Sequence, residues 1–185
     1  IALSTGETFT KEHLEEFNGM GYTALLVNLD ETSTGQLYDI DLLSEFCKAN
    51  GMYLIVDAIS AFLADEISMS KYGIDALIIS SQKALALEPG ISMVVLSPRA
   101  YSERAITIKS PTYYLDLKHH ILDQERGQTP FTPAVGTLLC LNDMLHMVDD
   151  IGIDEKIRRT RTLAEYFRQC AMDIGLRIPT YPLSN

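Results

Sequence analysis

Two polar residues, each placed after an apolar run, are the chemically informative pair in this chain. Lys83 closes a run that begins at Ala76, and Asp57 ends the run Tyr53–Val56, 26 residues earlier. A lysine amine can hold an aldehyde cofactor as a Schiff base, and a carboxylate can keep a pyridine nitrogen protonated so that the ring accepts electrons. The pair therefore predicts pyridoxal-phosphate chemistry.

One β-α-β unit would place these two groups side by side. Consecutive parallel strands joined by a helix bring their C-terminal ends to the same edge of a sheet. The residues after Lys83, Ala84–Leu87, are apolar. We therefore expect the ammonium to lie in surroundings where an unpaired charge is costly.

Each residue also has a purely structural interpretation. A lysine at the end of a strand usually only reaches solvent, and Asp57 is suited to cap the helix that follows it. Taken singly, the structural interpretation is preferred for both. Their spacing on two successive strands reverses that preference.

Composition indicates an ordinary globular domain and excludes several kinds of partner. The chain has 185 residues, of which 46% are hydrophobic and 22% charged, and a formal net charge of −10. Nucleic acid and anionic membranes would be repelled by such a charge. No apolar run approaches the roughly twenty residues that cross a bilayer, and residues 1–7 do not resemble a signal peptide. A cytoplasmic location is the expectation.

The cysteines and histidines suggest neither a disulfide framework nor a metal site. Cys47, Cys140 and Cys170 are odd in number and widely spaced. Their positions on apolar helical stripes predict buried thiols in the core. The four histidines show no ligand spacing, so we expect no metal.

The order of strands and helices predicts an α/β fold, a three-layer αβα sandwich with a mostly parallel sheet and one antiparallel strand. Because the link around Pro89 and Gly90 is too short for a helical crossover, the strand after it should be antiparallel. Segments 30–35, 57–60 and 80–83 would share one sheet edge and form a pocket there. The expected helices cover 10–19, 39–49, 69–72, 134–148 and 154–174, and the expected strands cover 23–29, 53–57, 75–83 and 91–97, with 97–133 irregular or in short helices and 176–178 beginning a strand of another domain.

Four segments resemble the class V aminotransferases, a branch of the fold-type I pyridoxal-phosphate enzymes that includes alanine-glyoxylate, serine-pyruvate and 2-aminoethylphosphonate transaminases. The four occur in the family's order, which makes the resemblance far more specific than any one segment. They are Glu31-Thr32-Ser33-Thr34-Gly35, Val56-Asp57-Ala58-Ile59-Ser60, Ser80-Ser81-Gln82-Lys83-Ala84-Leu85 followed by Pro89-Gly90, and Thr129-Pro130-Phe131-Thr132-Pro133-Ala134-Val135.

The resemblance implies a role for each matching residue. Lys83 would form the Schiff base with pyridoxal 5′-phosphate and move the α-proton of the substrate. Asp57 would pair with the pyridine nitrogen. Thr32 would bond the cofactor's phenolic oxygen or nearby groups, Gln82 would contact the phosphate, and Ile59 would pack on the ring.

Other roles implied by the resemblance involve a second subunit or weaker candidates. Thr132, together with Thr129, would donate to the phosphate of the partner subunit's cofactor, which implies a homodimer. Ser33 and Ser60 are weaker candidates for the cofactor site, because hydroxyls at strand ends often only cap backbone groups.

The chain departs from the family's pattern in two respects. Leu29 stands where the family commonly has a histidine, which affects substrate preference more than cofactor binding. Family members are also much longer, with an N-terminal phosphate loop and a C-terminal arginine for the substrate carboxylate. We therefore expect a central fragment, with residues 1–145 in the cofactor-binding large domain and 146–185 forming a linking helix and the beginning of a small C-terminal domain.

The preferred function is transfer of an amino group from an amino acid or aminophosphonate to a 2-oxo acid. One alternative is a related lyase or cysteine desulfurase, but those enzymes typically have a histidine directly before the lysine, where this chain has Gln82. The other alternative is a catalytically inactive fragment that binds a partner through the surface normally used for dimerisation.

Overall fold

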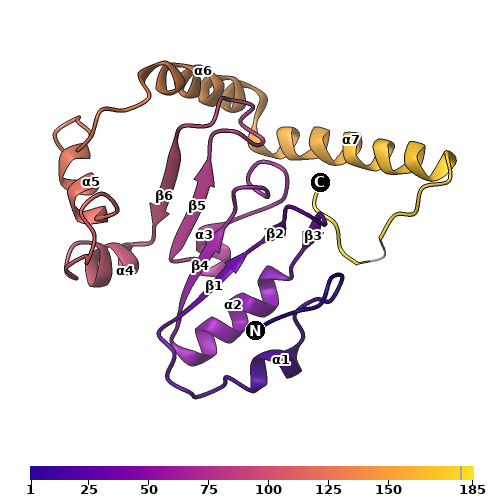
Figure 1. Ribbon diagram of the computed structural model, residues 1–185, viewed down its shortest axis with the longest axis horizontal. Coiled ribbons are helices and arrows are strands. Elements are labelled where there is room, and N and C mark those ends of the chain that lie inside the picture. The colour runs from indigo at the N-terminus through magenta and orange to yellow at the C-terminus, as the bar shows by residue number, and fades with distance from the viewer. Residues whose placement is uncertain (180) are drawn as a thin grey trace.

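A four-stranded sheet forms the centre of the computed structural model, which describes residues 1–179 and 181–185 (Figure 1). The strand order is β1-β4-β5-β6; β1, β4 and β5 are parallel and β6 is antiparallel to β5. The predicted α/β fold with one reversed strand is confirmed. The strands are β1 (Ala24–Asn28), β2 (Asp30–Glu31), β3 (Gln36–Leu37), β4 (Tyr53–Asp57), β5 (Ala76–Ser80) and β6 (Ser92–Leu96).

The helices mostly follow the predicted positions. The sequence-based range 69–72 agrees with α3, whereas the first predicted helix is too long, because α1 ends at Glu15 and the chain continues in turns. No helix in the described ranges is both long and apolar enough to cross a membrane. The helices are α1 (Lys11–Glu15), α2 (Ile40–Asn50), α3 (Met69–Tyr72), α4 (Pro98–Ala100), the π-helical turn η1 (Tyr101–Ala105), α5 (Leu117–Gln124), α6 (Val135–Ile151) and α7 (Ile153–Asp173).

The crossover through α2 makes β1 and β4 parallel. The Asp39 side chain caps α2 by accepting a hydrogen bond from Leu42 N at 3.1 Å. Gly51 ends the helix with a φ of 64°, a conformation that glycine adopts without steric cost. This short, well-capped crossover returns the chain directly into β4, which carries Asp57.

The two faces of the sheet differ in burial. Leu54 and Val56 point to the covered face and are 0% exposed, within a core that also includes residues of α1, α2 and α3. The opposite face, here called the open face, carries Leu26, which is 72% exposed, and Val94, which is 42% exposed. Asp57 alternates with Val56 and therefore lies on the open face.

A second apolar cluster joins the loop after β5 to α6. Leu85 and Leu63 pack there with Leu141 and Val148 of α6. Figure 1 shows α6 and α7 running along the end of the sheet at which β5 terminates. This cluster therefore anchors α6 beside the residues that follow β5.

Two of the three predicted core thiols are wrong. Cys47 of α2 is buried, as expected, whereas Cys140 of α6 and Cys170 of α7 are exposed. The reason is that, in the described chain, α6 buries only Leu141 and Val148 and α7 only Ala171, so most of their apolar positions face outward. Apolar residues at helical spacing in a sequence do not reveal whether another part of the chain covers that face of the helix.

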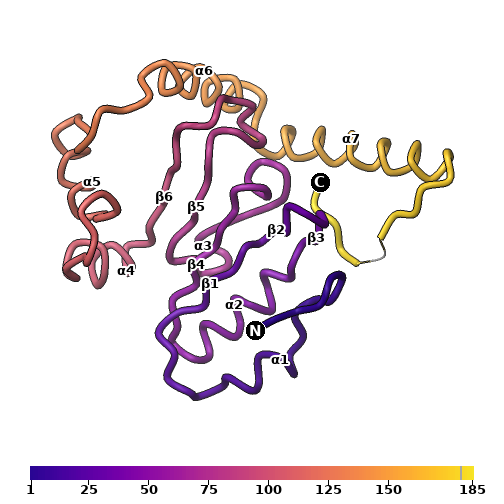
Figure 2. The backbone as a smooth tube through the Cα atoms, viewed as in Figure 1, coloured from indigo at the N-terminus to yellow at the C-terminus, as the bar shows by residue number. Residues whose placement is uncertain are grey.

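The predicted strand at 176–178 is not formed. Those residues are irregular, and the chain instead returns to β3, where Leu183 makes an isolated antiparallel bridge with Gln36 (Figure 2). Leu37 N donates to Pro182 O and Ser184 N to Gly35 O, both at 2.9 Å. The division into domains at 145/146 stays a prediction.

Candidate active site

The carboxyl ends of β1, β4 and β5 form one continuous edge. The register pairs Asn28 with Asp57 and Asp57 with Ile78. The ladder continues past the strand ends, because Leu29 N donates to Asp57 O and Ala58 N donates to Ile78 O, each at 2.9 Å. The segments that follow the three strands are therefore neighbours, as predicted.

Asp57 is half-buried at the centre of this edge. Its Oδ1 accepts a hydrogen bond from Ile59 N at 2.9 Å, which holds the carboxylate in one orientation. Asp57 therefore caps a turn, whereas the structural interpretation expected a helix directly after β4. The carboxylate nevertheless lies on the open face of the sheet, where a ligand can approach it.

The hydroxyl-rich turn after β1 reaches the segment after β4. Thr32 Oγ1 and Ser60 Oγ are 2.8 Å apart and share a hydrogen bond. Residues 28 positions apart in the sequence are thus brought together at the predicted pocket. Both hydroxyls lie near the Asp57 turn, because Ile59 and Ser60 belong to it.

Lys83 lies in a turn and not at the end of a strand. β5 ends at Ser80, and the turn is closed by a 2.8 Å hydrogen bond from Ala86 N to Lys83 O. The Lys83 side chain is exposed, so the expectation of apolar surroundings is wrong. The turn directs Leu85, which is 1% exposed, into the second apolar cluster and leaves Lys83 on the outside.

Gln82 is held by the strand that precedes it. Ser80 Oγ donates to Gln82 Oε1 at 2.5 Å and to Ile91 O at 3.2 Å. With the amide oxygen used in this way, the Gln82 NH₂ group is the part of the side chain that can donate to an anion.

The Glu31 carboxylate organises the turn that holds Thr32. It accepts hydrogen bonds from Ser33 N at 3.0 Å, from Ser33 Oγ at 2.7 Å and from Asn28 Nδ2 at 3.0 Å. These bonds hold the pKa of Glu31 below its ordinary value. Ser33 therefore serves the turn itself, which favours its structural interpretation.

Asp30 and Asp65 are charged residues near the site that sequence reasoning missed. Burial raises the pKa of both carboxyls, and for Asp30 the Ser184 hydroxyl and the positive charge of Lys83 oppose this effect. Asp65 accepts from Ser184 Oγ at 2.5 Å and from Asn185 Nδ2 at 2.8 Å.

The Oδ1 atom of Asp30 is buried and has no hydrogen-bond partner in the described chain. The one sequence signal for Asp30 is that it is acidic and directly precedes the Glu31-Thr32-Ser33-Thr34-Gly35 motif.

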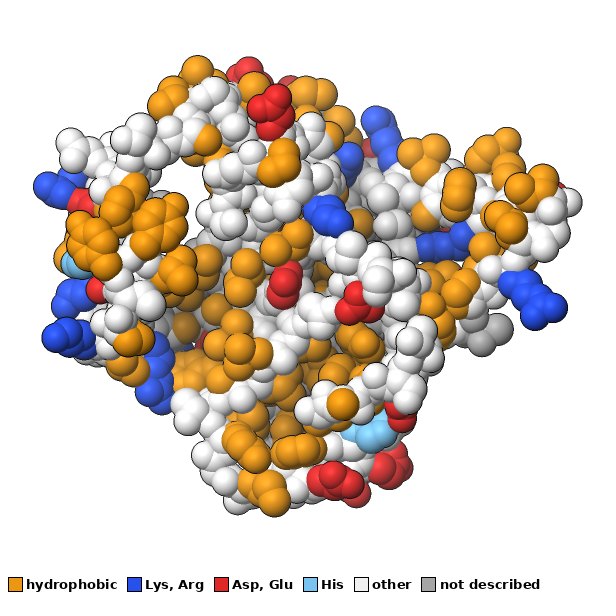
Figure 3. Space-filling view, in the orientation of Figure 1, with side chains coloured by type: hydrophobic (Ala, Val, Ile, Leu, Met, Phe, Trp, Pro, Cys, Tyr) orange, Lys and Arg blue, Asp and Glu red, His pale blue; other side chains and the backbone are white. Residues whose placement is uncertain are grey.

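The Thr129–Thr132 segment is anchored away from the sheet edge. Phe131 packs against Tyr114, with ring centroids 4.6 Å apart, and against Tyr113 at 5.6 Å. Apolar side chains gather at the surface near α5, where these tyrosines are largely exposed (Figure 3). Thr129 Oγ1 donates to Phe131 O, and Thr132 is exposed. No hydrogen bond in the described ranges joins either threonine to the segments after β1, β4 or β5.

A family model for class V aminotransferases matches residues 2–176. The chain belongs to the class V aminotransferase family. Two solved aminotransferase structures share the fold of this chain. The chain superposes with a TM-score of 0.82 and 30% identity on an aspartate aminotransferase of Thermus thermophilus, and with 0.85 and 26% on an alanine–glyoxylate aminotransferase of Nostoc sp.. The aligned part covers 91% and 96% of this chain and 48% of each of those chains.

Curated relatives in the class V aminotransferase family carry several names. The chain is 34% identical over 159 residues to a soluble hydrogenase small subunit of a Synechococcus strain, covering 85% of this chain and 41% of that protein. It is 30% identical to the alanine–glyoxylate aminotransferase of Rattus norvegicus, covering 93% and 43%. It is 37% identical to a 2-aminoethylphosphonate–pyruvate transaminase of Burkholderia mallei, covering 79% and 38%. The chain thus spans about two fifths of these relatives.

The residues at the carboxyl edge of this family member fit a pyridoxal phosphate group in their chemistry. An exposed primary amine, an oriented carboxylate, a hydroxyl pair and an amide NH₂ are present at Lys83, Asp57, Thr32 with Ser60, and Gln82. Amines, carboxylates and neutral donors are the groups that an aldehyde, a pyridine nitrogen and a phosphate require, respectively.

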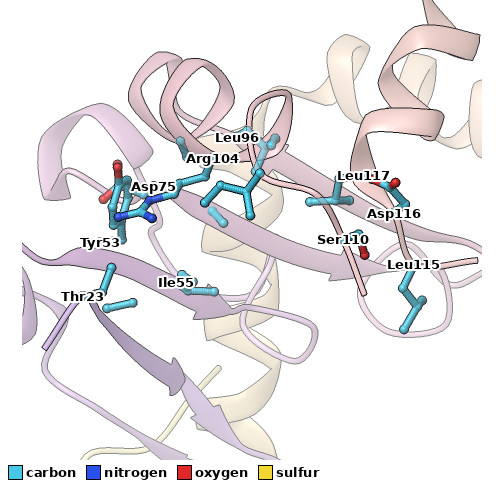
Figure 4. A pocket seen from close by; sticks show the side chains of 15 residues that line it. Thr23, Tyr53, Ile55, Asp75, Leu96, Arg104, Ser110, Leu115, Asp116 and Leu117 are labelled. Atoms are coloured by element: carbon cyan, nitrogen blue, oxygen red, sulfur yellow. The ribbon is translucent and has the colours of Figure 1, made fainter. Parts of the chain in front are cut away.

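A pocket lies at the opposite edge of the sheet. It has a volume of about 410 Å³ and is lined by residues from the amino ends of β1, β4 and β5, by the end of β6, and by the arm that follows α4. Figure 4 shows Tyr53, Asp75 and Arg104 grouped at one end and Leu115, Asp116 and Leu117 at the other. Because Lys83, Asp57 and Thr32 are not among its lining residues, this pocket is not the candidate site.

Proposed function

We propose that the protein is a pyridoxal-phosphate-dependent aminotransferase that moves an amino group from an amino acid or an aminophosphonate to a 2-oxo acid. The observation that carries the proposal is the parallel pairing of β4 with β5, which brings the end of β4 at Asp57 alongside the part of β5 that leads to Lys83. Membership of the class V family supports the same reaction.

Bound pyridoxal phosphate supplies an electron-withdrawing ring that stabilises negative charge at the α-carbon of the substrate. Asp57 would keep a proton on the pyridine nitrogen, which strengthens that effect, and its bond to Ile59 N keeps the carboxylate directed. Lys83 would hold the aldehyde carbon through its primary amine, and the free amine would be the base that moves the α-proton of the substrate.

The remaining residues orient and hold. Thr32 and Ser60 present hydroxyls on one side of the Asp57 turn, and Thr32 would donate to the phenolic oxygen. The Gln82 amide would donate to the phosphate, since Ser80 occupies its oxygen. Ile59 would pack on the ring face. Thr132 and Thr129 of the partner subunit would complete the phosphate site of a homodimer.

The range of substrates is part of the proposal. The named relatives act on alanine with glyoxylate and on 2-aminoethylphosphonate with pyruvate. Amino acids and aminophosphonates are therefore the donors to test, with glyoxylate and pyruvate as acceptors. A cytoplasmic location, inferred from composition, belongs to the same proposal.

A transaminase assay on the full-length protein tests the function. We expect amino transfer from at least one donor among alanine, serine, aspartate and 2-aminoethylphosphonate, lost in Lys83→Ala and retained in Lys11→Ala, a matched change at an exposed lysine of α1. Absence of transfer from all of them, with sulfur released from cysteine, would contradict the proposal and favour a desulfurase.

The desulfurase alternative is supported by fold alone. A cysteine desulfurase of Thermococcus onnurineus superposes with a TM-score of 0.68 at 16% identity. Here Gln82 precedes the lysine, and the three cysteines lie on α2, α6 and α7, whereas a nucleophilic cysteine would need a mobile loop near the site.

A further inference from the structure

A fully buried serine lies two residues before the proposed catalytic lysine. Ser81 is 0% exposed, whereas Gln82 and Lys83, which follow it, are exposed. Small hydroxyl residues are buried in this way when their polar atoms have partners, because an unpaired buried hydroxyl costs free energy. The partners of Ser81 therefore indicate what it does.

Ser81 closes the loop that carries Lys83. Its Oγ donates to Glu88 O at 2.7 Å and accepts from Ile91 N at 3.4 Å. Its backbone adds two bonds, since Ser81 N donates to Ile91 O and Leu87 N donates to Ser81 O, both at 3.1 Å. Ser81, at the beginning of the loop between β5 and β6, is thus hydrogen-bonded to Leu87 and Glu88 within the loop and to Ile91 at its end.

The same loop is held from outside at two other points. Leu85 is 1% exposed in the cluster with Leu141 and Val148 of α6. Gly90 lies beside the beginning of α6, where an added Cβ would be in ordinary van der Waals contact with the Ala134 Cβ at 3.6 Å. Gln82 and Lys83 are exposed between Ser81 and Leu85, so Ser81 fixes the point at which this exposed segment begins.

We infer that Ser81 is a positioning residue for Lys83, acting through the hydrogen bonds of its hydroxyl to Glu88 and Ile91. This inference rests on the proposed function, because it concerns the placement of the lysine amine against the cofactor aldehyde. Ser81 does not touch the reacting atoms. It sets where the exposed amine stands relative to the Asp57 turn.

Ser81→Ala in the full-length protein tests the inference, with Ser44→Ala as the matched control. Ser44 is also buried, 3% exposed, and its hydroxyl donates to Tyr72 O at 2.5 Å, far from the lysine loop in sequence and on another element. Both changes remove one buried hydroxyl and should lower the melting temperature. Only Ser81→Ala should affect Lys83.

The expected result has three parts. In Ser81→Ala the dissociation constant for pyridoxal phosphate rises about tenfold, the size of effect that loss of a buried hydrogen bond produces. The pH midpoint of the bound cofactor's absorbance shifts relative to wild type. The Leu87 and Ile91 amides exchange faster with deuterium. Ser44→Ala leaves all three as in wild type.

A Ser81→Ala protein with the cofactor affinity, pH midpoint and amide exchange of Ser44→Ala would overturn the inference. If Ser81→Ala does not fold, Ser81→Cys is measured in its place; because a thiol forms only weak hydrogen bonds, the same three changes are expected at smaller size, and none of them in Ser44→Ala. If wild type binds no pyridoxal phosphate, the proposed function fails. In that case, acetylation of Lys83 by acetic anhydride, compared with Lys11 in each variant, still decides whether Ser81 positions the amine.

Discussion

At the scale of single residues, the candidate site depends on which polar atoms of each side chain form hydrogen bonds within the fold and which stay available to a ligand. Asp57 uses Oδ1 to cap its own turn, and Gln82 uses its amide oxygen to bind Ser80. These bonds restrict orientation without consuming the carboxylate charge or the amide NH₂ group. Asp57 can therefore cap its turn and keep its charge available to a ligand at the same time.

Asp57→Asn should remove the charge while leaving the turn intact, because the amide oxygen can still accept from Ile59 N. We expect kcat for amino transfer to fall by about two orders of magnitude or more, the usual cost of removing one preorganised electrostatic group. Steady-state kinetics check this, with the exposed Asp41→Asn of α2 as the control. Equal kcat values in the two variants would refute the role.

Cys47 provides a test of burial at the scale of a residue. Burial raises the pKa of its thiol to about 11, and the negative charge of Asp75 acts in the same direction. Since the thiolate is the reactive form, labelling at neutral pH should be about two orders of magnitude slower in the folded protein than after unfolding. Mass spectrometry of the Cys47 peptide after timed alkylation measures this, and equal rates would contradict the burial.

Asp57, Thr32 and Ser60 were predictable because strand ends and turn residues are local features of the sequence. Ser81 and Asp65 were not. The partners of Ser81 lie 7 and 10 residues away in a loop whose conformation the sequence does not reveal, and those of Asp65 lie about 120 residues away. Long-range hydrogen bonds of this kind have no period or motif.

At the scale of elements, strands and helices with clear boundaries were predicted well and apolar runs were over-extended. α3 and β4 have the predicted limits because capping residues and an acidic stop define them. The strand predicted to reach Lys83 ends at Ser80, because the chain then enters the turn closed by Ala86 N and Lys83 O and reverses into β6. Hydrophobicity alone cannot distinguish a strand from a buried loop that follows it.

Asp75 joins three elements at the amino end of the sheet. It accepts hydrogen bonds from Leu54 N of β4 at 3.1 Å, from Ser97 Oγ before α4 at 2.8 Å, and from Arg99 of α4. Burial alone would raise its pKa, but these bonds outweigh burial and the pKa of Asp75 lies below its ordinary value. The ionised form is therefore the one that stabilises the fold.

Because the folded-state pKa is depressed, this stabilisation is present above about pH 4 and is lost as the pH falls through the folded-state value. Asp75→Asn should lower the free energy of unfolding by about 1–2 kcal/mol at pH 7, since it removes the charge that pairs with the partly exposed Arg99 side chain. The difference from wild type should shrink below pH 4. Urea unfolding at pH 7 and pH 3 measures this, with the exposed Asp149→Asn of α6 as the control. A difference that does not change with pH would contradict this account of Asp75.

At the scale of the whole molecule, the chain has one covered and one open sheet face, and the candidate site lies on the open face. The order of the elements in the sequence indicated the class of fold, but not which face of the sheet would stay uncovered. Nor did it indicate that most apolar residues of α6 and α7, and with them Cys140 and Cys170, would be exposed. The return of residues 181–185 to β3 was also missed, because it depends on a pairing between segments about 147 residues apart.

A hybrid dimer tests the proposed contribution of a partner subunit. In a dimer that combines a Lys83→Ala subunit with a Thr132→Ala subunit, one site receives both changes and the other receives neither if Thr132 serves the partner. We then expect about half of wild-type activity from the hybrid and little from either mutant homodimer. If the hybrid is as inactive as the homodimers, Thr132 acts within its own subunit or the site is not shared.

The most direct test of the central claim is reductive trapping of pyridoxal phosphate on the full-length protein. Wild type and Lys11→Ala should develop a visible absorbance band that borohydride removes, with the cofactor's mass left on the peptide that contains Lys83. Lys83→Ala should show neither the band nor the mass. A folded wild-type protein that gives no adduct, or an adduct on a different lysine, would contradict the assignment of Lys83 and with it the proposed function.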